Sequence, residues 1–230
     1  MKKFVIILAG GVGKRMGLKI PKQFFNLNGK PILAHTIEKF FNYDNNLEII
    51  VVIPENQVEF WKKIIIENNF TIKHKIVHGG SERFFSVKNA VDTIKEKSLI
   101  AVHDGVRPFV SNSTLERCFK TAEIYGNAVP VIDLKDSIRK IKNGNNFSKK
   151  RENYKLVQTP QIFQSEILKK AYSQNYKKEF TDDASLIENL KKKIFLTDGN
   201  KENIKITDKF DLIIAENLYK NKKLYNFAKS

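Results

Sequence analysis

A glycine-rich loop with two basic residues follows the first apolar run of the chain. Residues 8–17 read LAGGVGKRMG. Glycine lets the backbone approach a phosphate chain closely, and successive N–H groups can form an anion-binding nest. The loop has neither the Gly-Lys-Ser/Thr ending of a Walker A loop nor the third glycine of a dinucleotide-binding loop. Its basic residues, Lys14 and Arg15, favour a nucleoside triphosphate held by backbone and side-chain charge, and an ordinary turn is the alternative.

A further basic candidate, Lys22, follows in the sequence Pro21-Lys22-Gln23. Proline fixes the local backbone, which lets Lys22 hold its point charge over the same phosphates. A solvated surface lysine is the alternative in a chain this rich in lysine. The pairing with the glycine-rich loop favours phosphate binding.

Five later segments also combine small, polar and charged residues. They are residues 78–87 (HGGSERFFSV), 102–108 (VHDGVRP), 158–161 (QTPQ), 181–185 (TDDAS) and 203–207 (NIKIT). No Ser/His/Asp arrangement or pair of carboxylates stands out among them. The segments therefore indicate chemistry that depends on charge and positioning.

Four of the six arginines lie in or beside these motifs: Arg15, Arg83, Arg107 and Arg151. A planar guanidinium can bind a phosphate or a carboxylate through two parallel hydrogen bonds, which a lysine cannot do. For Arg83 we favour a structural ion pair with a neighbouring carboxylate. For His103, next to a strand end, we favour a structural histidine bonded to a backbone group over a metal ligand or base.

The motifs, taken in order along the chain, resemble those of the 2-C-methyl-D-erythritol 4-phosphate cytidylyltransferase family. They are G-G-x-G-x-R-M, P-K-Q and the five later segments. The resemblance implies transfer of CMP from CTP to 2-C-methyl-D-erythritol 4-phosphate, with release of pyrophosphate, in the non-mevalonate isoprenoid pathway. Ribitol-5-phosphate cytidylyltransferases share most of these motifs, so ribitol 5-phosphate is an alternative acceptor. A non-catalytic nucleotide- or RNA-binding module on the same scaffold is the second alternative.

The resemblance also implies a role for each matching residue. Catalytic charge is expected from Arg15, Lys22 and Lys205. Nucleotide binding is expected from Ala9, Gly10, Gly11, Gly80, Ser81, Ser86 and Gly105. Contacts to the acceptor are expected from Asp104, Arg107, Ser137, Arg151, Thr159 and Thr181. Many family members carry alanine at the positions of Gly10 and Gly105, and both differences keep space for a ligand.

A metal ion and a second subunit are further implications of the resemblance. Mg²⁺, or another divalent cation, is expected to be held mainly by the triphosphate, with Asp104 as the protein carboxylate. A homodimer is expected in which each chain exchanges an arm formed by residues 133–158. Ser137 and Arg151 would then serve the active site of the partner.

The expected reaction explains why the motifs are rich in cations. A phosphate monoester has a second pKa of about 6 and is largely dianionic at pH 7, so it needs no general base to become a nucleophile. The remaining difficulty is to bring two polyanions together while charge grows on the departing pyrophosphate. Fixed cations and a metal ion solve it by positioning and electrostatic stabilisation.

The elements that must position these residues alternate between strand and helix. Apolar runs predict strands at 3–8, 48–53, 73–77 and 99–103, and helical spacing predicts helices at 32–41, 57–67, 84–95 and 114–125. This alternation predicts an α/β fold with a doubly wound, largely parallel Rossmann-like sheet, of the nucleotidyltransferase type that the resemblance implies. Ligands bind at the carboxyl ends of the strands in such sheets. We expect one domain over residues 1–230.

The pattern changes after residue 128 and again near the end of the chain. Extended pieces at 129–132 and 137–141 precede an Asn-Gly turn signal at Asn143, which predicts a β-hairpin. This hairpin is either an ordinary surface hairpin or a protruding arm that reaches a second subunit. A closing helix is predicted at 208–222, with Asp208 as its N-cap. One face of that helix is expected to carry Leu212, Ile213, Ala215 and Leu218.

Composition and charge limit the classes of function. A net charge of +16 suggests a polyanionic partner, but the lysines are dispersed and nucleic-acid motifs are missing, so we expect no nucleic acid as partner. The single cysteine, Cys118, cannot form an intramolecular disulfide, and we expect a cytoplasmic protein. No apolar run approaches the length of a membrane span, so no membrane association is expected.

Overall fold

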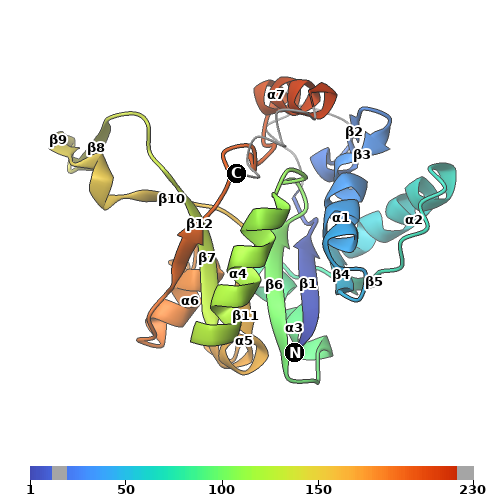
Figure 1. The fold of residues 1–230 in the computed structure, drawn as a ribbon, viewed down its shortest axis with the longest axis horizontal. Helices are drawn as coiled ribbons and strands as arrows, with labels where there is room; N and C mark the ends of the chain where they lie inside the picture. Colours follow the sequence, from blue (N-terminus) through green and yellow to red (C-terminus); the bar gives the residue numbers. More distant parts are fainter. Residues whose placement is uncertain (12–19, 222–230) are drawn as a thin grey trace.

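The computed structural model describes residues 1–11 and 20–221, which form a layered α/β structure around one mixed sheet (Figure 1). The strand order is β10-β7-β11-β6-β1-β4-β5, and β12 pairs with β7 beside this path. The strands are β1 (Lys2–Leu8), β4 (Glu48–Ile53), β5 (Lys75–His78), β6 (Ser98–Asp104), β7 (Asn127–Asp133), β10 (Lys155–Val157), β11 (Gln161–Gln164) and β12 (Leu196–Asp198).

The centre of the sheet is parallel, which confirms the predicted architecture. Strand β1 pairs in parallel with β4 and β6, and β4 pairs in parallel with β5. Strand β11 runs antiparallel between β6 and β7. In the register of the parallel strands Leu8 lies opposite both Val52 and Asp104. The ends of these strands therefore bring the glycine-rich loop and Asp104 to the same edge of the sheet.

Helices cover both faces of the sheet because its central strands are apolar on both sides. In β1, Val5 and Ile7 pack on one face and Phe4 and Ile6 on the other. The first face is covered by α1 (Ile32–Tyr43), α2 (Val58–Glu67) and α4 (Asn112–Tyr125). The second face is covered by α3 (Arg83–Thr93), α5 (Ser165–Tyr172) and α6 (Asp183–Asn189).

The last described helix, α7 (Lys209–Lys220), lies across the carboxyl edge of the sheet, near the small hairpin of β2 (Asn26–Leu27) and β3 (Lys30–Pro31) (Figure 1). Asp208 is its N-cap and forms a capping box with Asp211, which confirms the predicted start of the helix. Leu212 and Ala215 are buried, as expected. The placement of Ile213 on the buried face is wrong: its side chain is 57% exposed, since one residue is a rotation of about 100° around the helix.

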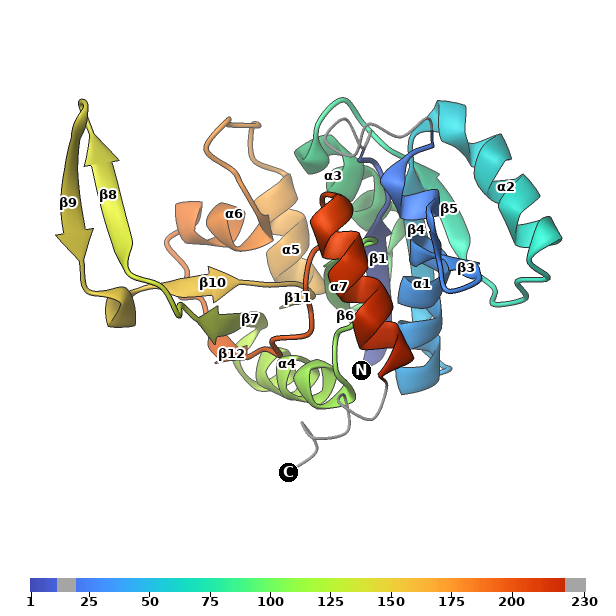
Figure 2. The ribbon, with the colours of Figure 1, turned by 90° about the horizontal axis from the view of Figure 1, so that it is seen from above.

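The predicted hairpin is present between β8 (Ile138–Lys142) and β9 (Asn145–Lys149). Its turn places Asn143 and Gly144 at φ values of 50° and 76°, the left-handed conformation that a two-residue hairpin turn requires. The hairpin projects away from the sheet and its helices (Figure 2). Its apolar side chains Ile141 and Phe147 are exposed in this single chain.

Candidate active site

A pocket of about 340 Å³ opens at the carboxyl edge of the parallel strands. Nine of the residues predicted for the site line it: Ala9, Gly10, Gly11, Lys22, Gly80, Ser81, Ser86, Asp104 and Lys205. They come from five separate motifs, which the fold brings together. Arg15, which was also predicted for the site, lies outside the described residues.

The glycine-rich side of the pocket is fixed by backbone bonds and by Gln23. The Ala9 N–H donates to the Val52 carbonyl at 2.8 Å, and Gln23 Nε2 donates to the Ala9 carbonyl at 2.7 Å. A Cβ added to Gly11 would lie 3.4 Å from Cε of Lys22, so the lysine stem runs along this glycine. The loop and Lys22 can therefore act on the same ligand group.

The opposite side of the pocket is formed by the turn before α3. The Gly80 N–H donates to Ser86 Oγ at 3.0 Å. A Cβ on Gly80 would lie 2.4 Å from Cβ of Phe85, so the turn can pack on the helix only with glycine here. The Ser86 hydroxyl accepts this bond and keeps its own proton to donate, which suits an acceptor atom on a base or a ribose.

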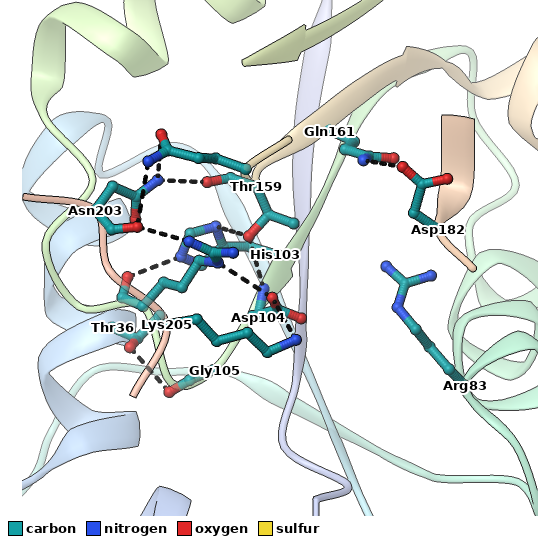
Figure 3. A network of polar contacts seen from close by, with 12 residues as sticks. Thr36, Arg83, His103, Asp104, Gly105, Thr159, Gln161, Asp182, Asn203 and Lys205 are labelled. Carbon is teal, nitrogen blue, oxygen red and sulfur yellow. Dashed lines mark hydrogen bonds and ion pairs between the residues drawn. The ribbon is translucent and has the colours of Figure 1, made fainter. Parts of the chain in front are cut away.

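Asp104 is the centre of the charged part of the pocket (Figure 3). Its Oδ2 lies 3.0 Å from Nζ of Lys205 and 3.2 Å from Nε of Arg107. Burial tends to raise the pKa of the Asp104 carboxyl, but the positive charges of Lys205, Arg83 and Arg107 outweigh this and hold the pKa well below its usual range. The carboxylate is therefore ionised at neutral pH and organises two cations.

His103 has a structural role, as the sequence indicated. It is fully buried, and its Nε2 lies 2.9 Å from the Arg107 carbonyl, to which it donates. Its Nδ1 lies 3.0 Å from the hydroxyl of Thr159, which in turn accepts the Asp104 N–H at 3.1 Å. Burial lowers the pKa of His103 to about 4, so the ring is neutral and holds the backbone of the 104–107 turn.

Arg83 lines the pocket and forms the structural ion pair that the sequence favoured. Its Nη1 and Nη2 lie 3.1 Å and 2.5 Å from the two carboxylate oxygens of Asp183. Asp183 is fully buried and also accepts a bond from the Tyr172 hydroxyl. This bidentate pair joins the first residue of α3 to the first residue of α6.

The other predicted residues lie outside the lining of this pocket. Thr159 is buried behind Asp104, and the side chain of Arg107 lies between Asp104 and Asn203. A Cβ at Gly105 would lie 2.9 Å from the Leu8 carbonyl oxygen, so close packing also requires glycine there. The three exposed residues are Thr181, Ser137 and Arg151.

Ser137 directly precedes β8 and Arg151 lies two residues after β9, on the arm that projects from the sheet (Figure 2), and neither residue lines the pocket. Arg151 donates to the Lys135 carbonyl and lies 3.5 Å from Glu152. The pocket of one chain thus collects six of the seven predicted nucleotide-binding residues, all except Gly105, while two of the predicted acceptor-binding residues lie on the arm.

Gln23 and Asn203 contribute to the site although the sequence assigned no role to either residue. Gln23 is buried in the pocket wall, and the Asn203 carbonyl accepts a bond from Arg107 Nη1 at 2.6 Å. Both lie inside motifs already identified, P-K-Q and N-I-K-I-T. Their places in these motifs could have marked Gln23 and Asn203 as candidates, but only the fold shows which groups the two residues contact.

Solved structures with this architecture define the class of the protein, which is a nucleotidyltransferase. 4-Diphosphocytidyl-2C-methyl-D-erythritol synthase from Anaerococcus prevotii matches with a TM-score of 0.80 at 26% identity, covering 96% of this chain and 97% of that chain. 2-C-methyl-D-erythritol 4-phosphate cytidylyltransferase from Francisella tularensis matches with a TM-score of 0.76 at 31% identity, covering 94% and 98%.

Sequence comparison identifies the family within this class. The family model for 2-C-methyl-D-erythritol 4-phosphate cytidylyltransferase matches residues 3–221, and the chain belongs to this family. The enzyme of that name from Bacteroides thetaiotaomicron is 46% identical over 218 residues, 95% of this chain and 100% of the relative. The enzyme of that name from Clostridium perfringens is 41% identical over 221 residues, 94% of this chain and 97% of the relative.

Proposed function

We propose that this chain transfers CMP from CTP to 2-C-methyl-D-erythritol 4-phosphate and releases pyrophosphate. The observation that carries the proposal is the convergence of Lys22, Lys205 and the Ala9–Gly11 backbone on one pocket. These groups supply cations and backbone N–H donors where a triphosphate must lie. In the reaction an oxygen of the acceptor phosphate attacks the α-phosphorus of CTP. The bond from that phosphorus to the bridging oxygen breaks, and pyrophosphate leaves with the electron pair.

The roles of the residues follow from their places around the pocket. Ser86 and the turn at Gly80 and Ser81 bind the nucleoside end, and the Ala9–Gly11 backbone binds the phosphates. Lys22 and Lys205 balance the charge that develops on the phosphates, and we propose the same role for Arg15 from its motif alone. The removal of one such cation is expected to lower kcat by about 10²–10³-fold.

The donor set of the pocket suits a metal ion that binds mainly through phosphate oxygens. Among residues 1–11 and 20–221 no group of three or more His, Cys, Asp or Glu side chains could hold a metal alone. The pocket offers two carboxylates, Glu82 and Asp104. Asp104 would hold Mg²⁺ together with the triphosphate, as this ion often binds in nucleotide sites. Bound there, the ion would neutralise charge on the phosphates.

We further propose a homodimer in which the arm at residues 133–158 completes the partner's site. Ser137 and Arg151 lie on this arm, and neither residue lines the pocket of its own chain. Arg107, Thr159 and Thr181 would meet the acceptor from the chain that binds CTP. The exposed Ile141 and Phe147 give the arm an apolar surface that a second subunit can cover.

The proposed location is the cytoplasm, in keeping with one buried, unpaired cysteine. No helix of the described segments is long and apolar enough to cross a membrane. We propose no nucleic-acid partner, because the chemistry of the pocket is accounted for by a mononucleotide.

The test is pyrophosphate release from CTP and Mg²⁺ with each acceptor offered separately. Release with 2-C-methyl-D-erythritol 4-phosphate and not with ribitol 5-phosphate supports the proposal. Release with ribitol 5-phosphate alone replaces the acceptor and keeps the catalytic residues. No pyrophosphate release with either acceptor, together with RNA binding that weakens as the salt concentration rises, would favour a non-catalytic module.

A further inference from the structure

Gln158 connects the last strand of the arm to a buried cluster of amide groups. Its side chain is only 4% exposed, and its backbone N–H donates to the Pro130 carbonyl at 2.8 Å. It directly follows β10, and Thr159 comes next in the chain. The backbone of Gln158 is therefore fixed on the sheet, and its side chain reaches the segment of residues 199–203.

The carboxamide of Gln158 uses both of its ends on that segment. Nε2 donates to the Asn200 carbonyl at 2.9 Å, with a longer contact of 3.5 Å to the Asn203 carbonyl. Oε1 accepts from the Asn200 N–H at 3.3 Å and from Asn203 Nδ2 at 3.4 Å. A side-chain amide offers both a donor and an acceptor in this arrangement, which an ionised carboxylate does not.

Asn203 carries the connection on to the charged centre of the site. Its Nδ2 donates to the Thr159 carbonyl at 2.8 Å, and its own carbonyl accepts from Arg107 Nη1 at 2.6 Å. Arg107 contacts Asp104, which also holds Lys205, two residues after Asn203 (Figure 3). The segment that Gln158 holds is therefore the one that places Lys205 and Arg107 around Asp104.

Gly199 packs closely against the carboxamide of Gln158. A Cβ added to Gly199 would lie 2.3 Å from Gln158 Oε1 and 3.2 Å from the Val131 carbonyl oxygen. The distance of 2.3 Å to Oε1 is too short for a contact between two heavy atoms that are not bonded, so a side chain at residue 199 must displace the carboxamide. The glycine thus keeps the space that Gln158 needs.

We propose that Gln158 is a positioning residue for catalysis, which sets Lys205 and Arg107 against Asp104 through the segment of residues 199–203. The inference rests on the proposed cytidylyl transfer and adds a residue to it. Gln158 is absent from the lining of the nucleotide pocket. Its loss should therefore change kcat much more than the KM for CTP.

The first experiment compares Gln158→Ala, Gly199→Ala and the double variant in the full-length protein. Each single variant should lower kcat by about 10- to 100-fold, because displacements of about 1 Å are costly in an aligned site. In the Gln158→Ala background Gly199→Ala should cost much less than in the wild type, since the shortened side chain removes the closest contact and leaves only the 3.2 Å approach to the Val131 carbonyl oxygen. Equal damage from Gly199→Ala in both backgrounds, or an unchanged kcat in Gln158→Ala, would overturn the inference.

Gln164→Ala is the matched control. Gln164 also donates from its carboxamide to two backbone carbonyls, those of Ala122 and Glu123 near the end of α4. Gln164 does not line the pocket. It should keep wild-type kcat. A loss there equal to that of Gln158→Ala would mean that any missing carboxamide slows the enzyme, and would overturn the inference.

Gln158→Glu covers the case in which the alanine variant does not fold. A carboxylate keeps the shape but cannot donate to the Asn200 carbonyl, whereas a protonated carboxyl can. The kcat of Gln158→Glu, divided by that of wild type at each pH, should therefore rise as the pH falls. A flat ratio would contradict the proposal.

A crystal structure of Gln158→Glu or Gln158→Ala tests the inference without turnover. We expect Asn203 to move and the contact of Lys205 with Asp104 to lengthen beyond its present 3.0 Å. An unchanged contact would overturn the inference even if the proposed reaction were correct. If the wild type releases no pyrophosphate, the proposed reaction fails, and this structure still decides the role of Gln158.

Discussion

Lys205 Nζ and Asp104 Oδ2 lie 3.0 Å apart, although the two residues are about a hundred positions apart in the sequence. Asp104 ends β6, and Lys205 lies on the segment that leads to α7. The ion pair aims the lysine into the pocket, and Arg107 contacts the same carboxylate oxygen. One carboxylate thus aligns two cations before a nucleotide binds, which reduces the reorganisation needed during the reaction.

Lys205→Ala should lower kcat by about 10²–10³-fold with a smaller change in the KM for CTP. The reason is that its charge would act mainly on the phosphates as pyrophosphate departs. Steady-state pyrophosphate release measures both constants. Lys201→Ala is the control, because Lys201 is exposed on the same segment and does not line the pocket. Equal losses in the two variants would remove the specific role of Lys205.

Ser86→Ala should raise the KM for CTP by about tenfold and leave kcat nearly unchanged, the size expected for one hydrogen bond. The variant loses the acceptor for the Gly80 N–H and the donor that faces the pocket. Calorimetric titration with CTP provides an independent affinity. Ser173→Ala, at the end of α5, should bind CTP as the wild type does. An unchanged affinity in Ser86→Ala would exclude the proposed contact.

Asp183→Asn should destabilise the protein by about 3 kcal/mol, because it leaves Arg83 without its carboxylate in a largely buried place. Tyr172 also loses a charged partner. Urea unfolding gives the free energy of unfolding. The exposed pair of Lys88 and Asp92 in α3 offers the comparison, and Asp92→Asn should cost less than about 0.5 kcal/mol. Similar costs at both positions would show that burial of the Arg83 pair has no special weight.

His103 should make the protein less stable as the pH falls below about 6.5. Burial lowers the pKa of His103 from 6.5 to about 4, so between these values the unfolded chain binds a proton that the folded chain does not. Stability from this group is therefore complete above pH 6.5 and is lost as the pH falls toward 4. His103→Gln should show a shallower loss of the free energy of unfolding between pH 7 and pH 5.

A second histidine contributes to this pH dependence. Burial also lowers the pKa of His74, so the wild-type curve contains a contribution that His103→Gln retains. The difference between variant and wild type isolates His103. Parallel curves for wild type and His103→Gln would contradict the assignment.

The proposed exchange of arms predicts complementation between two inactive variants. Arg151→Ala damages the arm, and Lys205→Ala damages the pocket. A hybrid dimer would contain one site with both residues intact, so mixing equal amounts through unfolding and refolding should restore about a quarter of wild-type activity. No recovery in hybrids confirmed by mass spectrometry would place Arg151 in the site of its own chain.

Much of the fold could be predicted because its signals are local. The predicted strands and helices agree with the structure to within two residues at either end. Strand β11 and the three-residue β12 received no prediction, because their pairing with β6 and β7 stabilises them more than their own short sequences do. Asp208 allowed the start of α7 to be predicted. Which face of the helix is buried depends on how α7 packs against Leu27 and Val106.

The candidate site also has features that could be predicted from the sequence and features that could not. The glycine-rich loop and Asp104 could be placed together in advance, because parallel strands end at a common edge. The structural roles of His103 and Arg83 were also expected. The amide contacts of Gln158 and Asn203 could not be predicted, since they join residues more than forty positions apart through orientations that only tertiary packing sets.

The pairing of Leu8 with Val52 and Asp104 has a consequence for how this sequence could change over evolution. Neighbouring strands are about 4.8 Å apart whatever side chains they carry. The spacing between the glycine-rich loop and Asp104 is therefore set by the backbone. Genomic pressure could exchange surface residues for lysine, up to the present net charge of +16, without moving the reacting groups.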